Sequence, residues 1–248
     1  MPVSGAGTGW SARCRVWELS LRVLGYRCIA GVDEAGRGSL AGPVVAAAVV
    51  LPDAFSSEGI DDSKRLSPAQ REEAFARIMA DASAVAVGIA PHDDIDRINI
   101  FEATKQAMRQ AVMTLRPTPD FLLIDGAALP CAWPVWGLIK GDRRALPIAA
   151  ASIIAKVTRD RLMTLYDGQY PGYGFAVHKG YGTPDHLAHL RRLGACAIHR
   201  KSFQPVKRAG MGADASVDHA ETASRPAPEQ ASKRVPNIVP KHVPKHVQ

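Results

Sequence analysis

The chain has few cysteines, and their positions exclude two kinds of scaffold. Its four cysteines lie at positions 14, 28, 131 and 196, with no CxxC pair and no metal-ligand spacing among them. Disulfide frameworks and structural zinc sites are recognised by such spacings. The sequence therefore predicts neither, and we expect a reducing compartment.

Long apolar segments are also absent. The longest apolar run covers residues 40–52, contains a proline, and is shorter than the ~20 residues that a membrane helix needs. Residues 1–24 carry Arg13, Arg15, Glu18 and Arg22 without an unbroken apolar core, unlike a secretory signal. We therefore expect a soluble, cytoplasmic protein that does not associate with membranes.

Sequence fingerprints of several enzyme classes are missing as well. The chain has no P-loop, no dinucleotide-binding glycine motif and no pattern typical of a Ser-His-Asp triad. Acidic residues are outnumbered, because 31 Lys and Arg stand against 24 Asp and Glu, a net charge of +7. That surplus favours a polyanionic partner such as nucleic acid.

Composition divides the 248 residues into three regions. Residues 26–205 hold nearly all the apolar periodicity and are expected to form the folded domain. Residues 1–25 form an N-terminal extension. Residues 206–248 are rich in Ala, Ser, Pro, Glu, Lys and His. They predict a disordered basic tail, because such a segment buries too little surface to offset its ordering entropy.

Strand-like and helix-like segments alternate through the middle region. Apolar runs predict five strands, at residues 27–33, 44–51, 84–90, 121–125 and 135–139. Apolar spacing predicts helices at residues 99–115 and 148–166. Ser67 and Thr183, each followed by proline, mark two further helix starts. This mixture predicts an α/β domain around one sheet.

Four acidic residues follow hydrophobic strands and predict a shared site. Asp33 and Glu34 precede a glycine-rich turn, Asp125 ends the segment FLLID, and Asp142 follows another strand. A single such acid is typical of a capped turn, but four at strand ends favour a cluster at one sheet edge. Because close carboxylates repel, a cluster needs protons or a cation. Oxygen ligands without His or Cys favour Mg²⁺ or Mn²⁺.

Several loop residues suit contact with a nucleic-acid backbone. Glycines permit close approach of a backbone, and lysine or arginine beside them can bind phosphate. Tyrosine in a loop can stack on a sugar or base. The candidates are Gly36, Arg37, Gly38, Lys64, Lys179 and Tyr181. A plain glycine turn or a solvated basic loop would account for any one of them alone.

Other patterns favour structural explanations. Lys156 and Asp160 are four residues apart on a helix and predict a surface ion pair. The acids beside His92 are typical of a helix start rather than a metal site. Three later histidines are spread over a helix and the following loop and predict no joint site: His186, His189 and His199.

Taken together, these segments resemble ribonuclease HII, the bacterial type 2 ribonuclease H, in order across residues 30–203. The matching stretches are GVDEAGRGSLAGPVVAAAVVL, DDSKRLS, INIFEAT, LLIDG, KGD with AAASIIAKVTRDRLM, and YPGYGFAVHKGYGTPDHLAHLRRLGACAIHRKSF. The resemblance implies a ribonuclease H-like fold over residues 26–205, with a central mixed β-sheet flanked by helices and a small helical C-terminal part. It also implies cleavage of RNA in RNA–DNA hybrids and nicking of duplex DNA 5′ to an embedded ribonucleotide, leaving 3′-hydroxyl and 5′-phosphate ends.

The resemblance further implies residue roles. The family's metal-binding acids fall on Asp33, Glu34 and Asp125, and Asp142 completes the catalytic acids. Two divalent cations, Mg²⁺ or Mn²⁺, would activate water and stabilise the leaving oxygen. The family's motif that reads the 2′-hydroxyl falls on Gly36, Arg37, Gly38 and Tyr181. Lys64 and Lys179 would hold the phosphate backbone.

Two other functions remain open. A nuclease of the same fold could act on DNA. Cleavage that depends on a 2′-hydroxyl in the substrate would distinguish a ribonuclease H from such a DNA nuclease. A non-catalytic nucleic-acid binder would suit the positive charge, but a cluster of acids facing phosphates argues against it. A monomer is expected, because no oligomerisation pattern stands out.

Overall fold

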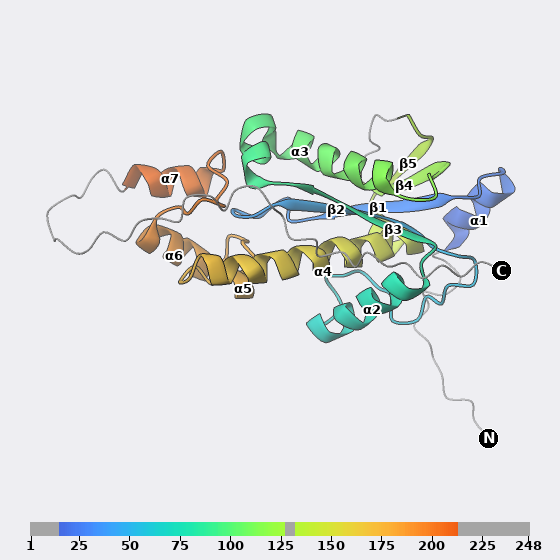
Figure 1. The fold of residues 1–248 in the computed structure, drawn as a ribbon, viewed down its shortest axis with the longest axis horizontal. Coiled ribbons are helices and arrows are strands. Elements are labelled where there is room, and N and C mark those ends of the chain that lie inside the picture. Colours follow the sequence, from blue (N-terminus) through green and yellow to red (C-terminus); the bar gives the residue numbers. More distant parts are fainter. Residues whose placement is uncertain (1–14, 127–131, 213–248) are drawn as a thin grey trace, which may run out of the picture.

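The computed structural model describes residues 15–126 and 132–212 and contains a five-stranded mixed sheet between helices (Figure 1). The sheet order is β3-β2-β1-β4-β5. Strand β2 pairs antiparallel with β1 and β3, whereas β4 pairs parallel with β1 and β5. The strands are β1 (Ile29–Ala35), β2 (Val44–Val50), β3 (Ala84–Ala90), β4 (Phe121–Asp125) and β5 (Val135–Leu138). The predicted mixed sheet is confirmed.

Helices cover both faces of the sheet. In Figure 1 the long helices α3 and α4 lie on opposite faces, and α2 lies outside α4. The helices are α1 (Val16–Val23), α2 (Pro68–Asp81), α3 (His92–Thr114), α4 (Leu146–Gln169), α5 (Phe175–His178), α6 (Pro184–Leu193) and α7 (Gln204–Gly212). A 3₁₀ turn, η2 (Gly141–Arg143), precedes α4. No helix within these described ranges is long and apolar enough to cross a membrane.

The predicted helix at residues 99–115 proves to be the second part of α3, which already begins at His92. Asn99 has a φ of 69° inside the helix, and this kink separates two helical segments. Its side-chain oxygen accepts hydrogen bonds from the amides of Phe101 and Glu102 and so caps the second segment. The periodicity detected only that segment.

Two glycines let the helices approach the sheet closely. A Cβ at Gly31 would lie 2.0 Å from the carbonyl carbon of Pro147 in α4. A Cβ at Gly88 would lie 2.0 Å from the carbonyl oxygen of Ala107 in α3. Because side chains alternate along a strand, Asp33 lies on the same face of β1 as Gly31, the face covered by α4.

Short helices form the ends of the molecule. Helices α5, α6 and α7 lie together at one end and make up the predicted small helical C-terminal part (Figure 1). At the other end, Leu21 of α1 packs with Ile29 and Phe121 of the sheet. The boundaries at residues 25 and 205 remain predictions, and α7 continues past 205 to Gly212. Most of the predicted tail, residues 213–248, lies outside the described residues.

Candidate active site

Three of the four predicted acids meet at one end of the sheet. Asp33 lies near the end of β1, and Asp125 is the last residue of β4. Parallel pairing of these strands places both side chains at the same sheet edge. Asp142 joins them from η2, and one carboxylate oxygen from each of the three lies within 4.8 Å of the others.

Glu34 lines the same pocket but is not part of this close group. As the next residue after Asp33 on β1, it leaves the strand on the opposite side. Its carboxylate lies 3.8 Å from the guanidinium of Arg37. Its predicted role as a metal ligand therefore stays a prediction.

The electrostatics of the cluster favour a bound cation. Burial raises the pKa of Asp33 well above its ordinary value, and the carboxylates of Glu34 and Asp125 raise it further. Burial also raises the pKa of Asp125. The hydrogen bond that the amide of Gly141 donates to its carboxylate at 2.6 Å lowers this pKa but does not cancel the effect of burial. Hard oxygen donors in a buried, mutually repelling group fit a divalent metal ion. The Asp33, Asp125 and Asp142 cluster is this chain's divalent-metal site.

An ion pair between a buried carboxylate and a half-exposed arginine holds the loop before α2 against the cluster. The Asp62 carboxylate, which is fully buried, accepts hydrogen bonds from Nε and Nη2 of Arg143 at 2.9 and 2.7 Å. Its other oxygen accepts the amide of Lys64 at 2.9 Å. The Lys64 ammonium lies 3.2 Å from the carboxylate of Asp142, so the structure brings this predicted residue into the site.

The predicted glycine turn and Tyr181 form the opposite wall of the pocket. The cavity, here called the acid pocket, has a volume of about 220 Å³. It is lined by Asp33, Glu34, Ala35, Gly36, Arg37, Gly38, Ser63, Lys64, Asp125, Ser152, Lys156 and Tyr181. The hydroxyls of Ser63 and Ser152 are hydrogen-bonded to each other at 2.8 Å.

Sequence reasoning missed Lys156 as a pocket residue. The predicted ion pair with Asp160 is confirmed at 2.6 Å, but both side chains are only about one-fifth exposed. The ammonium of Lys156 lies 5.7 Å from the centre of the Tyr181 ring, within range of a cation–π contact. The i,i+4 spacing predicted a surface ion pair. Only the packing of Tyr181 on α4 shows that Lys156 also lines the acid pocket.

Lys179 lies beside the acid pocket rather than in it. Its ammonium donates a hydrogen bond to the hydroxyl of Thr164 at 2.8 Å. It lines an adjoining groove of about 630 Å³ between α2, α4 and α5, which Lys156 shares with the acid pocket. The groove adjoins the acid pocket, and its lining carries Arg71, Lys156, Arg161 and Lys179 beside Glu72 and Asp160.

The histidines behave differently from the prediction. No joint site was predicted for His186, His189 and His199, but the Nε2 atoms of His186 and His199 are 3.1 Å apart in the buried C-terminal part. Nδ1 of His186 donates to the carbonyl of Tyr181, and Nδ1 of His199 accepts the amide of Cys196. This order requires both rings to be neutral. Residues 13 positions apart meet because α6 and the segment after it fold back together.

The acids beside His92 do not form a metal site within the described ranges. Asp93 and Asp94 lie in the first turn of α3, as the pattern predicts. Asp96 instead accepts hydrogen bonds from the amides of Lys201 and Ser202, both at 2.8 Å. This contact ties α3 to the segment that leads into α7.

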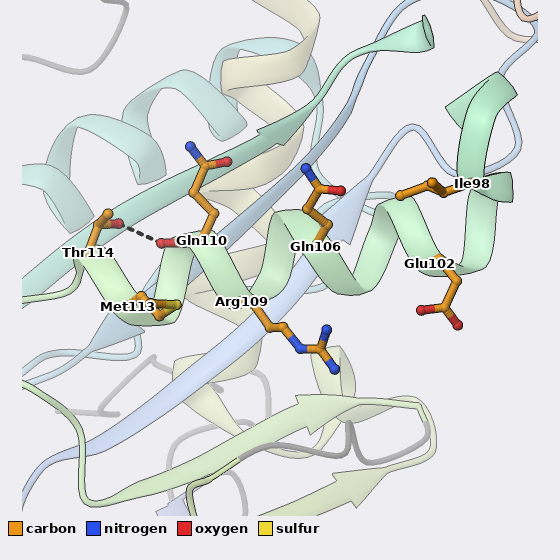
Figure 2. A pocket seen from close by; sticks show the side chains of 7 residues that line it. All are labelled: Ile98, Glu102, Gln106, Arg109, Gln110, Met113 and Thr114. Atoms are coloured by element: carbon orange, nitrogen blue, oxygen red, sulfur yellow. Dashed lines mark hydrogen bonds between the residues drawn. The ribbon is translucent and has the colours of Figure 1, made fainter. Parts of the chain in front are cut away.

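A further hollow lies on the outer side of α3 (Figure 2). It has a volume of about 620 Å³ and is lined by Ile98, Glu102, Gln106, Arg109, Gln110, Met113 and Thr114. Helix α3 covers the face of the sheet opposite α4, and Glu102 is the single carboxylate of this lining. The hollow therefore lacks the ligands of a metal-dependent site.

Comparison with known proteins agrees with this geometry. The family model described as ribonuclease HII matches residues 30–206. The ribonuclease HII of Listeria monocytogenes serotype 4a (strain HCC23) is 58% identical over 198 residues, covering 80% of this chain and 76% of that protein. The ribonuclease HII of Geotalea uraniireducens (strain Rf4) is 58% identical over 192 residues, covering 77% and 89%.

Solved structures show the same fold. The ribonuclease H2 from Pyrococcus horikoshii OT3 matches with a TM-score of 0.65 and 27% identity, covering 77% of this chain and all of that one. The ribonuclease HII in a complex with PCNA from Archaeoglobus fulgidus matches with a TM-score of 0.60 and 26% identity, covering 69% and 91%. The fold is ribonuclease H-like. With its buried acid cluster and these matches, the chain belongs to the ribonuclease HII family of endonucleases, which cleave RNA in RNA–DNA hybrids.

Proposed function

We propose that this ribonuclease HII also nicks duplex DNA on the 5′ side of a single embedded ribonucleotide, leaving a 3′-hydroxyl and a 5′-phosphate. One observation carries the proposal: residues 36–38 and Tyr181 line the same pocket as the carboxylate cluster. Backbone amides and a phenol beside the reacting phosphate are suited to contact a 2′-hydroxyl, which distinguishes RNA from DNA. A single ribonucleotide then suffices for recognition.

Beyond the divalent-metal site of Asp33, Asp125 and Asp142, we propose that Glu34 contributes a further metal ligand, so that these four residues are the catalytic acids. Two divalent cations, Mg²⁺ or Mn²⁺, held by these carboxylates would supply an activated water and would stabilise negative charge on the leaving 3′-oxygen. The chain's own residues prepare the ligands. The amide of Gly141 orients the Asp125 carboxylate through its 2.6 Å hydrogen bond.

Basic side chains would hold the substrate along the adjoining groove. Lys64 stands at the acid pocket, where its ammonium already neutralises Asp142 and can also contact phosphate. Lys156 and Lys179 continue this positive surface into the groove between α2, α4 and α5. Phosphate contacts of this kind position a nucleic acid without reading its sequence.

The test uses labelled duplexes that differ at one position. One carries a single ribonucleotide, a second is all DNA, and a third is a continuous RNA–DNA hybrid. With Mg²⁺ or Mn²⁺ we expect one nick 5′ to the ribonucleotide, no cut in the all-DNA duplex, and no reaction in EDTA. Hybrid cleavage without the single nick would contradict the proposal while keeping the family activity.

We also propose that the enzyme acts as a monomer in the cytoplasm. The carboxylates, Lys64 and Tyr181 of the acid pocket can all be supplied by a single chain, which supports a site formed within one subunit. Light scattering after gel filtration should give one chain of 26.6 kDa, and a stable dimer would contradict the proposal.

A further inference from the structure

Two buried arginines have an unusual environment. Arg159 and Arg200 are both 0% exposed, and neither forms an ion pair with a carboxylate in the described part of the chain. Burial of a charge is costly unless the charge is compensated. Burial and the nearby charge of Arg159 lower the pKa of Arg200 to about 9, so it still carries its charge at pH 7.

Arg200 donates all its hydrogen bonds to one loop. Its guanidinium contacts the carbonyl oxygens of Gly36 at 2.7 Å, Arg37 at 2.9 Å and Gly42 at 3.0 Å. These carbonyls belong to residues 36–43, here called the glycine loop, which connects β1 to β2. Three charge-assisted hydrogen bonds compensate the buried charge and orient the peptide groups of the loop.

Arg159 joins the same loop to the Tyr181 segment. It donates to the carbonyls of Pro43 at 2.9 Å, Ala41 at 3.1 Å and Lys179 at 2.9 Å. Its guanidinium carbon also lies 5.3 Å from the centre of the Tyr181 ring. The two arginines therefore connect α4, the segment before α7 and both loops that wall the acid pocket.

The direction of the carbonyls determines the direction of the amides. In a trans peptide the C=O of one residue and the N–H of the next point to opposite sides. With the carbonyls of Gly36 and Arg37 turned inward to Arg200, the amides of Arg37 and Gly38 point outward. Both residues are exposed and border the acid pocket. Neither amide has a hydrogen-bond acceptor among the residues that the structure describes.

Gly36 is required for this arrangement. Its φ is 89°, and a Cβ there would lie 1.9 Å from Nε of Arg159. The arginine thus occupies the space that a side chain would need. A guanidinium on the carbonyl side also polarises the peptide, which strengthens its N–H as a donor.

We propose that Arg200 and Arg159 are positioning residues that direct the amides of Arg37 and Gly38 at the ribonucleotide and so determine selectivity for RNA. The inference rests on the proposed function. Their effect is on recognition, because the carboxylates are held separately by β1, β4 and η2. Removing the arginine hydrogen bonds should weaken binding at the ribonucleotide and leave the general affinity for duplex unchanged.

The test is Arg200→Lys, which keeps a positive charge but loses the planar fork that reaches three carbonyls. Binding is measured with Mg²⁺ in an Asp33→Asn background, which prevents cleavage, on duplexes with one ribonucleotide and with none. We expect the ratio of the two dissociation constants to fall about tenfold, roughly the effect of one lost charged hydrogen bond. The dissociation constant for all-DNA duplex should stay within about twofold, as expected for intact phosphate contacts.

Arg116→Lys is the matched control, because Arg116 also donates to two backbone carbonyls, those of Met113 and Leu115, away from the acid pocket. It should leave the ratio unchanged. Equal weakening of both duplexes by Arg200→Lys, or an unchanged ratio, would show a merely structural role. An Asp33→Asn protein that has no preference for the ribonucleotide would instead contradict the proposed function.

A second measurement avoids changing Arg200. In the Asp33→Asn protein, amide NMR signals of Arg37 and Gly38 should shift and gain protection from hydrogen exchange with the ribonucleotide duplex, and less so with all-DNA duplex. This result is independent of whether Arg200→Lys folds. Amides that respond equally to both duplexes would overturn the inference.

Discussion

The two walls of the acid pocket are supported in different ways. Asp33 and Asp125 lie on neighbouring parallel strands, where ladder hydrogen bonds hold the backbone. The glycine loop and Tyr181 have no such ladder. One isolated bridge joins Ala41 to His199, and buried Arg159, Arg200 and the neutral histidines of the C-terminal part supply further contacts. One wall depends on the register of the sheet, and the other depends on long-range polar contacts.

This difference implies that catalysis and recognition can be separated. Changes in the carboxylate wall should abolish cleavage without loss of binding. Changes in the loop wall should alter which substrate is preferred, with a smaller loss of cleavage rate. Variants in each wall therefore test whether the two supports are independent.

The largest effect is expected for Asp33→Asn. It removes a negative charge from the buried cluster, so cleavage should fall at least about 10³-fold while affinity for the hybrid is retained. Single-turnover cleavage and a binding titration measure the two effects. Asp53→Asn is the control, because that carboxylate is 75% exposed and pairs only with Arg22 among its described neighbours. Activity of Asp33→Asn near that of the parent chain at saturating Mg²⁺ would contradict the assigned role.

A large effect on stability is expected for Gly31→Ala, which tests the support of the carboxylate wall. The new Cβ would clash with the backbone of Pro147 in α4, so the free energy of unfolding should fall by about 3 kcal/mol. Urea denaturation measures it. Gly168→Ala in the same helix meets open space and should instead be neutral or slightly stabilising. Equal stability of both variants would show that α4 does not press on β1.

A smaller effect is expected for Tyr181→Phe in the loop wall. Loss of one hydroxyl contact should reduce nicking at a single ribonucleotide about tenfold and hybrid cleavage less, because a hybrid offers many 2′-hydroxyls. Cleavage rates on the two substrates give the comparison. Tyr170→Phe, beyond the acid pocket, should change neither rate. Equal losses on both substrates would remove Tyr181 from ribonucleotide recognition.

The smallest effect at neutral pH concerns the histidine support of Tyr181. Burial lowers the pKa of both His186 and His199 to about 4, below the ordinary value of 6.5. In the unfolded chain both take up protons below pH 6.5, so this pair's contribution to stability is full above that pH and is lost as the pH falls toward 4. NMR titration of the imidazoles should find them neutral at pH 5 in the folded state. If the two imidazoles titrated near pH 6.5 without unfolding, the neutral, hydrogen-bonded histidine pair would be disproved.

Local patterns predicted much of the fold. Strands β3 and β4 have the predicted bounds, since each is an apolar run closed by turn residues. Ser67 forms a complete capping box with Gln70, and Thr183 accepts the amide of His186, as their positions before proline suggest. These features depend on residues within a few positions of one another.

Contacts between distant residues could not be predicted from local patterns. Arg200 and Gly36 are 164 positions apart, and nothing in the sequence near either residue indicates their hydrogen bond. The same holds for Lys156, whose local partner Asp160 concealed its place beside Tyr181. For Lys179 the local pattern suggested a place beside Tyr181 in the site. The structure instead places its ammonium in the neighbouring groove.

The sequence by itself determined the alternation of strands and helices, the acids at the strand ends and the family. The first two follow from local apolar periodicity, and the family follows from motifs that occur in a fixed order along the chain. The tertiary structure alone decided that Asp142 rather than Glu34 completes the close group of carboxylates. It also decided which buried charges support the glycine loop. The physical reason is that carboxylate spacing and charge compensation depend on how η2, α4 and the C-terminal part pack in three dimensions.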